Sequence, residues 1–326
     1  MGIKRKIQKS AGSDEVYLFE AFEEFILEKE VRNLATATIK NYELTFRLFC
    51  EFNEFDNNTL TTDVTLSSVY KWINTMKQED VKISSINHYL RDLGVILHWY
   101  MDIDRGYIEP FKMPKLETQE EPPKAFEDDE IEALLEKPRR NDSFVTWRTY
   151  VIVNWVLGTG NRAATICDVK ISDINFSKRE ITLGHTKNKK AQIIPLSSSL
   201  ETVLKEYIKM WRREAAADAW LFCNIGEEKL TTNALRISFA KYCKDRGVDK
   251  TNIHGLRHTF AKGWVKNNGN QFALQKILGH SKLTMTSKYV KLYSEDIKDD
   301  FDKFNPLDTI KRSTKRTKTV KRSSDY

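Results

Sequence analysis

Four of the seven prolines in this 326-residue chain fall within positions 110–123. Proline lacks a backbone N–H and fixes φ, so neither a helix nor a central strand can run through such a stretch. A chain of this length is also longer than one compact core usually requires. The proline-rich stretch therefore divides the chain, and we expect an extended interdomain linker at residues 109–124.

Ahead of this linker, apolar residues recur at intervals of three and four, which is the spacing of amphipathic helices. The pattern predicts four helices: residues 17–29, a helix capped by Thr38, residues 65–78 and residues 83–101. Together they predict an all-α helical bundle over residues 14–108, preceded by a basic tail at residues 1–13. This pattern alone is compatible with almost any small helical domain.

After the linker the pattern becomes mixed, which predicts a mainly helical α+β domain over residues 125–305 and a basic tail at 306–326. Three short strands are expected between Ile171 and Leu196, two of them forming a hairpin of residues 180–187 and 191–197. The expected helices begin at Asp128 and cover residues 146–157, a short stretch after Arg162, and residues 198–213 and 231–245.

Composition excludes several classes of protein. The chain is 40% hydrophobic and 30% charged, which is typical of a globular protein. No run approaches the ~18 apolar residues of a membrane span, and the start, MGIKRKIQKS, lacks the apolar core of a signal peptide. We therefore expect a cytoplasmic protein with no membrane partner.

Cysteines and charge narrow the function less. Cys50, Cys167, Cys223 and Cys243 are scattered without a C-x-x-C pair, so we expect reduced thiols and no metal site. The net charge of +7 is concentrated in the two tails. Basic tails suit phosphate contacts, but solubilising tails are equally basic, so charge alone does not establish DNA binding.

The segment from Ile253 to Val290 carries the densest set of reactive side chains. His254 and Arg257 are one helical turn apart and project from the same helix face. His280 follows Gly279, and Tyr289 comes shortly after. Arginine binds phosphate oxygens, histidine exchanges protons and tyrosine can act as a nucleophile. The segment therefore predicts an oxyanion site, with phosphate as the best candidate, against the alternative of histidines and a tyrosine that merely pack in a core.

These motifs resemble a known signature. HGLRHTFA followed by LGHSKLTMTSKYV looks like the second half of the tyrosine recombinase (phage integrase) signature, and TGNR, ending in Arg162, resembles its first arginine box. The resemblance covers about residues 125–292. It implies a tyrosine recombinase catalytic domain, and a helical domain of the core-binding, SAM-like kind that wraps DNA together with it. The implied catalytic residues are Arg162, His254, Arg257, His280 and Tyr289.

The family also places a lysine on the hairpin between the two arginine boxes. Alignment on Ile194-Pro195-Leu196 selects Lys187, with Lys189 and Lys190 as alternatives. One position departs from the family, because Thr165 stands where an acidic residue usually orients the first arginine or a histidine. The other histidines are expected to have no chemical role: His258, which we expect to support the fold, and His88, His98 and His185.

The resemblance implies a mechanism without a metal or another cofactor. Tyr289 attacks a DNA phosphodiester and forms a 3′-phosphotyrosyl bond, while two arginines and His280 stabilise the nonbridging oxygens. His254 is the expected acceptor of the tyrosine proton, and Lys187 is the expected donor to the 5′ leaving oxygen.

The implied function is site-specific DNA recombination by a homotetramer that exchanges strands between two double-stranded DNA sites through a Holliday junction. An integrase or excisionase of a mobile element and a chromosome- or plasmid-dimer resolvase both remain open. A type IB topoisomerase and a DNA-binding regulator are alternatives from other classes. Residues 292–303 predict a short helix that either docks on a neighbouring protomer or packs on its own domain.

Overall fold

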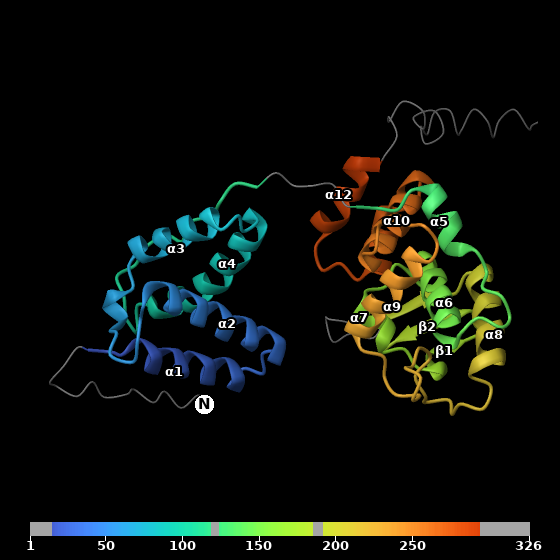
Figure 1. The fold of residues 1–326 in the computed structure, drawn as a ribbon, viewed down its shortest axis with the longest axis horizontal. Helices are drawn as coiled ribbons and strands as arrows, with labels where there is room; N and C mark the ends of the chain where they lie inside the picture. The colour runs from blue at the N-terminus through green and yellow to red at the C-terminus, as the bar shows by residue number, and fades with distance from the viewer. Residues whose placement is uncertain (1–14, 119–123, 185–191, 294–326) are drawn as a thin grey trace, which may run out of the picture. The chain divides into compact units, whose positions relative to one another are not determined.

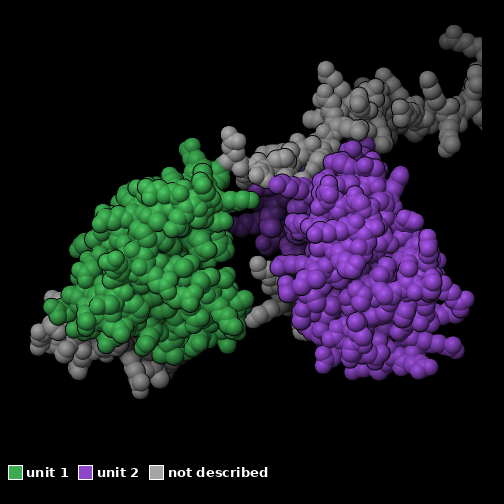
Figure 2. Space-filling model, viewed as in Figure 1, with its two compact units in different colours: residues 1–121 green, residues 122–326 purple. Residues whose placement is uncertain are grey.

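The computed structural model describes residues 15–118, 124–184 and 192–293 (Figure 1). The chain forms two compact units, residues 1–121 and residues 122–326 (Figure 2). We call the first the helical unit and the second, after the catalytic domain that the family resemblance implies, the catalytic unit. Each is described by itself.

The helical unit is all α, as the apolar spacing predicts. Its helices are α1 (Leu18–Val31), α2 (Thr36–Asn53), α3 (Leu66–Gln78) and α4 (Ile83–Tyr100) (Figure 1). The expected cap at Thr38 is wrong, because α2 begins earlier, after Ala35. By contrast, the Thr65 hydroxyl accepts a hydrogen bond from the backbone N–H of Ser68 and so caps α3. The core combines aliphatic side chains with aromatic ones, including Phe25, Phe49 and Tyr100.

Part of the expected linker packs on the helical unit. The side chain of Asn87 on α4 pairs with both backbone groups of Leu116, donating to its carbonyl at 2.8 Å and accepting from its N–H at 3.0 Å. Phe111 and Met113 also pack against the helical core. Proline prevents helix formation here but does not prevent packing, because an extended chain can still bury its apolar side chains.

The catalytic unit is a mainly helical α+β fold around a three-stranded antiparallel sheet in the order β1-β2-β3. The strands are β1 (Ile174–Asn175), β2 (Glu180–Leu183) and β3 (Gln192–Pro195), with Ile181 opposite Ile194. The connection between β2 and β3 lies outside the described residues at 185–191. The helices are α5 (Asp128–Leu135), α6 (Phe144–Thr159), α7 (Ala163–Cys167), α8 (Ser198–Trp211), α9 (Thr232–Lys244), α10 (Ile253–Lys266), α11 (Gln271–Leu278) and α12 (Leu283–Tyr293).

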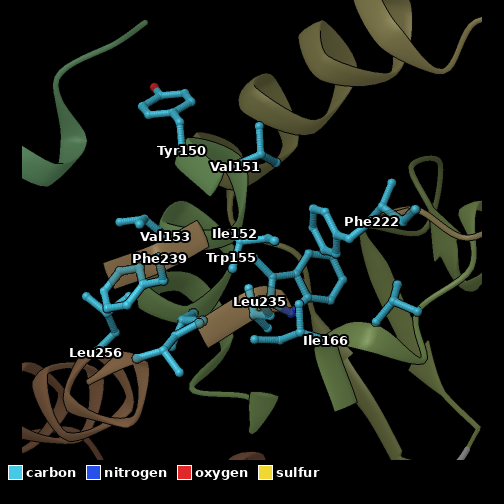
Figure 3. Packing of buried hydrophobic residues seen from close by; sticks show 14 of the residues in the cluster. Tyr150, Val151, Ile152, Val153, Trp155, Ile166, Phe222, Leu235, Phe239 and Leu256 are labelled. Atoms are coloured by element: carbon cyan, nitrogen blue, oxygen red, sulfur yellow. The ribbon is translucent and has the colours of Figure 1, made fainter. Parts of the chain in front are cut away.

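Helix α6 lies at the centre of the catalytic unit. It packs against α5, α8, α9 and α10, and its sequence is apolar on all sides, as expected for a buried helix. Figure 3 shows Trp155 of this helix close to Phe222; the two rings meet edge to face with centroids 5.6 Å apart. This rigid core fixes the C-terminal end of α6, where the next segment begins with Arg162.

A smaller hydrophobic cluster joins α10, α11 and α12. It contains Ala261, Val265, Leu274, Leu278 and the ring of Tyr289. No helix in the described stretches is long and apolar enough to cross a membrane. The helix predicted at residues 292–303 falls outside the described residues from position 294 onward.

Candidate active site

Arg257 occupies the centre of the candidate site. It is 2% exposed, and its guanidinium donates hydrogen bonds to the carbonyls of Gly160 (2.7 Å) and Leu278 (2.9 Å). These carbonyls end α6 and α11, where a helix presents unpaired carbonyls and the negative end of its dipole. Two helix ends therefore hold this buried cation in place of a carboxylate.

Glycine is required where α6 and α11 end. Gly160 (φ 65°) and Gly279 (φ 62°) both adopt the left-handed conformation that closes a helix. A Cβ at Gly160 would also lie 2.6 Å from the ring of Phe260 and 2.7 Å from Leu278. The glycines of the TGNR and LGH motifs thus aim the carbonyls that hold Arg257.

Arg162 reaches the same place from another element. It lies immediately before α7, and its guanidinium donates to the Leu278 carbonyl at 3.4 Å. Burial first, and then the charge of Arg162, lower the pKa of Arg257 to about 10, so both arginines remain charged at neutral pH. Among the described residues, neither arginine forms an ion pair with a carboxylate. Two cations that repel each other and lack a counter-ion favour an anionic ligand.

Thr165, which stands where the family usually has an acidic residue, does not hold Arg162. Arg162 is positioned by the Leu278 carbonyl, and among the described residues its guanidinium makes no hydrogen bond to the Thr165 hydroxyl. The family's acidic residue is therefore absent both in sequence and as a charge close to Arg162 in the described part of the chain.

His280 is held on both ring nitrogens. Arg257 donates to Nε2 at 2.8 Å, so Nε2 must be unprotonated; Nδ1 then carries the proton and donates to the Thr286 hydroxyl, also at 2.8 Å. Burial, followed by the charges of Arg257 and Arg162, lowers the pKa of His280 to about 4. In this state His280 orients Arg257, and its Nε2 would have to change partner to donate to a phosphate.

Tyr289 is buried beside these groups, with 5% of its surface exposed. Its ring is nearly parallel to that of His280, with centroids 6.5 Å apart, and its hydroxyl lies 2.8 Å from Nδ1 of His258. The phenol also contributes to the electrostatic environment of Arg162 and Arg257. The candidate nucleophile therefore lies beside His280, the residue that contacts Arg257.

His254 lies on α10, one helical turn before His258. Its ring is exposed and meets the ring of His258 edge to face, with centroids 4.7 Å apart. The surrounding protein, followed by the charges of His258, Arg257 and Arg162, lowers the pKa of His254. His254 is therefore a neutral imidazole at neutral pH, and its ring contacts that of His258.

The three lysine candidates, Lys187, Lys189 and Lys190, lie outside the described residues, as does His185. The strand that follows them is tied to the site. The Gln192 side-chain amide donates to the carbonyls of Lys276 (2.5 Å) and Ile277 (2.9 Å) at the end of α11. This clasp connects β3 to the turn that carries His280.

Sequence reasoning missed three contributors: the His258–Tyr289 contact, the Thr286 partner of His280 and the Gln192 clasp. None of them has a periodic signal, because each joins residues from different elements. The one available hint was the position of His258, one helical turn after His254 on α10.

Comparison with known proteins identifies the family of this chain. The phage integrase family matches residues 124–296. Tyrosine recombinase XerC of Staphylococcus aureus (strain bovine RF122 / ET3-1) is 25% identical over 275 residues, covering 83% of this chain and 91% of the relative. Tyrosine recombinase XerD of Listeria monocytogenes serotype 4b (strain F2365) is 26% identical over 303 residues, covering 89% and 98%.

Solved structures share the fold. The Tn1549 transposon integrase in complex with a circular intermediate DNA has a TM-score of 0.70 at 22% identity, covering 91% of this chain and 98% of that one. A lambda integrase tetramer bound to a Holliday junction has a TM-score of 0.68 at 18% identity, covering 87% and 80%.

The chain therefore belongs to the phage integrase family. It is a tyrosine recombinase, an enzyme that cleaves and rejoins DNA in site-specific recombination. The topoisomerase alternative is not favoured.

Proposed function

We propose that the cluster of side chains around Arg257 is the catalytic site of this recombinase and that Tyr289 is its nucleophile. The observation that carries the proposal is the convergence of Arg162 and Arg257 on one carbonyl, that of Leu278, beside the buried Tyr289. A backbone carbonyl is neutral, so it positions a guanidinium group without neutralising its positive charge, and this charge can attract an anionic ligand. A DNA phosphodiester supplies the matching negative charge.

The proposed reaction is a transesterification. The Tyr289 oxygen attacks the phosphorus, the bond to the 5′ oxygen breaks, and the 3′ phosphate stays on the enzyme. Arg162 and Arg257 stabilise the charge that grows on the nonbridging oxygens, which is worth most in a site with little water. Lys187 is our proposed donor to the departing 5′ oxygen. The phosphotyrosyl bond retains the energy of the phosphoester, so resealing needs no nucleotide cofactor.

The proposed assembly is a homotetramer that joins two double-stranded DNA sites and passes through a Holliday junction. The shared fold of the lambda integrase tetramer on such a junction supports this assembly. We propose that the helical domain, residues 14–108, and the catalytic domain, residues 125–305, both contact the DNA. We also propose the cytoplasm as the place of action, since the substrate is cellular DNA and the four cysteines are free thiols.

Two biological roles fit this enzyme equally. Its similarity to XerC and XerD supports a role in dimer resolution, and its shared fold with a transposon integrase supports a role in mobile-element transfer. The DNA that becomes covalently attached distinguishes them.

The test is to incubate the full chain with sheared genomic DNA of its source, to trap the covalent adducts and to sequence the attached ends. The wild type should attach through a 3′ phosphate at a defined site, and Tyr289→Phe should bind DNA without attaching. Tyr293→Phe, which removes the nearest phenol along α12, is the matched control and should attach normally. Peptide mapping that placed the DNA adduct on Tyr293 would refute the assignment of Tyr289 as the nucleophile.

A further inference from the structure

The hydroxyl of Tyr289 is already in contact with a base. His258 on α10 places Nδ1 2.8 Å from the phenolic oxygen on α12, and these two helices pack against each other. The contact is shielded, because Tyr289 is 5% exposed and His258 is half-buried. Shielding from water strengthens a hydrogen bond and fixes its geometry.

The direction of this hydrogen bond follows from the charges nearby. Burial, followed by the charge of Arg257, lowers the pKa of His258, so its ring is neutral at neutral pH. A phenol has an ordinary pKa of about 10 and is protonated under the same conditions. Tyr289 therefore donates its proton to Nδ1, and the remaining proton of His258 sits on Nε2.

We propose that His258 is a further catalytic residue, the one that accepts the proton of Tyr289 as this oxygen attacks the DNA phosphate. The inference rests on the proposed role of Tyr289. As the bond from Oη to phosphorus forms and the bond to the 5′ oxygen breaks, the phenolic proton moves to Nδ1. The leaving oxygen takes a proton from a separate acid. In the reverse step His258 returns its proton to Tyr289, and the balance is restored.

The proposed proton transfer to Nδ1 of His258 also bears on the position of His254. Its ring is perpendicular to that of His258 at 4.7 Å and is exposed to water. His254 therefore contacts the proposed base from a solvent-exposed position, while His258 is in contact with the reacting oxygen. This order differs from the one that the family motif implies, in which His254 takes the proton.

The same contact could instead hold Tyr289 in an inactive position until DNA binds. The two roles predict opposite results, since removal of a lock accelerates cleavage and removal of a base slows it. His258→Asn separates them, because the amide oxygen occupies nearly the same position as Nδ1 and accepts the hydrogen bond but cannot take the proton.

The experiment measures single-turnover cleavage of a nicked duplex whose sequence comes from the trapped adducts. His258→Asn should reduce the rate by about 10²- to 10⁴-fold, the usual contribution of general acid–base catalysis. DNA affinity and the melting curve should stay near those of the wild type. His98→Asn, an exposed histidine on α4, is the matched control and should cleave normally.

A second readout separates proton transfer from positioning. A duplex with sulfur in place of the 5′ bridging oxygen needs no acid, so its cleavage rate should rise with pH until the base is unprotonated and then level off. The groups that face His258 are Arg257 and His254 on its own helix and Tyr289 on α12. His258→Asn should remove the plateau, whereas His254→Asn should keep it.

A His258→Asn rate within a few-fold of the wild type, a faster rate, or an unchanged plateau would overturn the proposal. None of these results would affect the proposed nucleophile, which depends on the loss of adducts in Tyr289→Phe. If instead Tyr289→Phe still formed adducts, the proposed function itself would fall first.

Discussion

Two buried charges, Asp92 in the helical unit and Arg257 in the catalytic unit, are held in opposite ways. In the helical unit, the carboxylate of Asp92 is 5% exposed and accepts from Nε and Nη2 of Arg91, both at 3.1 Å, while His88 lies 3.4 Å away. In the catalytic unit, Arg257 is 2% exposed and is held by carbonyls and a neutral histidine. One buried charge has its counter-ion, and among the described residues the other has none.

Glu28 shows the paired arrangement in more detail. Its Oε2 accepts hydrogen bonds from Trp99 and Arg105, both at 2.8 Å, and Arg32 pairs with Oε1 at 2.9 Å. Burial raises the pKa of Glu28, but the hydrogen bond from Trp99 and the surrounding cations outweigh it and lower the pKa overall. This carboxylate therefore adds stability above its unfolded pKa, and the stability is lost as pH falls through the folded pKa.

The difference indicates function. A paired charge has no need of a ligand. The Glu28 contact with Trp99 joins α1 to α4, whereas the Asp92 pairs lie within α4. An unpaired buried cation is costly unless something binds to it, so such residues concentrate at functional sites. The comparison predicts that substitution of Arg162 costs activity more than stability, and that substitution of Asp92 does the reverse.

The largest effect is expected at Lys187, the proposed acid. Lys187→Ala should slow cleavage of normal DNA by about 10²- to 10⁴-fold, because the 5′ alkoxide leaves poorly without a proton. On the duplex with 5′ bridging sulfur, the same variant should recover most of its rate, since a thiolate leaves without protonation. Arg162→Ala should not recover, because its lost contact is to nonbridging oxygens.

Lys189→Ala and Lys190→Ala are the matched controls for this prediction. If the 5′ bridging sulfur rescues cleavage by one of these variants and does not rescue Lys187→Ala, the replaced lysine of the rescued variant is the acid. If no lysine variant is rescued, proton donation comes from another residue, and His254 is the first to examine.

The next effect is expected at Arg162. Arg162→Ala should slow cleavage by about 10²- to 10³-fold, as loss of one donor to a charged transition state usually does. Among the described residues, the hydrogen bond of its guanidinium to the Leu278 carbonyl is long, at 3.4 Å, so the free energy of unfolding should change by less than about 1 kcal/mol. A urea melt and a single-turnover assay on the same preparation check both values. A variant that unfolds easily yet cleaves well would contradict the comparison.

Asp92→Asn should show the opposite balance. The substitution leaves Arg91 and His88 without their anion and should lower the stability of the helical unit by about 1–3 kcal/mol. Cleavage by DNA-bound enzyme below the melting temperature should be unchanged. Unfolding followed at the helical unit's own transition measures the loss. A slower chemical step with unchanged stability would place Asp92 in a functional site.

Much of the fold could be predicted from sequence because it depends on local pattern. The helices from 65 and from 83 were located by apolar spacing, and Gly279 ends α11 in the conformation that glycine favours. The packing of residues 111–116 on the helical unit could not be predicted, since Asn87 and Leu116 are distant in sequence and carry no matching motif.

The candidate site divides in the same way. Arg162, Arg257, His280 and Tyr289 were found through motif resemblance, and their spacing on the chain says nothing of how they are held. The helix ends at Gly160 and Leu278 act through backbone carbonyls, which every residue possesses. A backbone acceptor leaves no trace in the sequence beyond the glycine that turns it, so the means of holding Arg257 had to come from the structure.

The smallest predicted effect is also the most direct test of the unpaired cations, and it needs no DNA. Sulfate resembles a phosphodiester in charge and shape, and it should bind between Arg162 and Arg257. At about five times its Kd, a ligand of the native state adds about 1 kcal/mol, which shifts the melting temperature of a unit this size by about 2–4 °C.

Sulfate also stabilises proteins in general by exclusion from their surface. The quantity to measure is therefore the shift in wild type minus the shift in Arg162→Ala, at equal ionic strength with chloride as reference. The catalytic unit should show this difference and the helical unit should show none, because Arg91 and Arg105 already have carboxylate partners. Equal shifts in both proteins would mean that the two arginines do not form an anion site, and the contrast between the two units would lose its functional meaning.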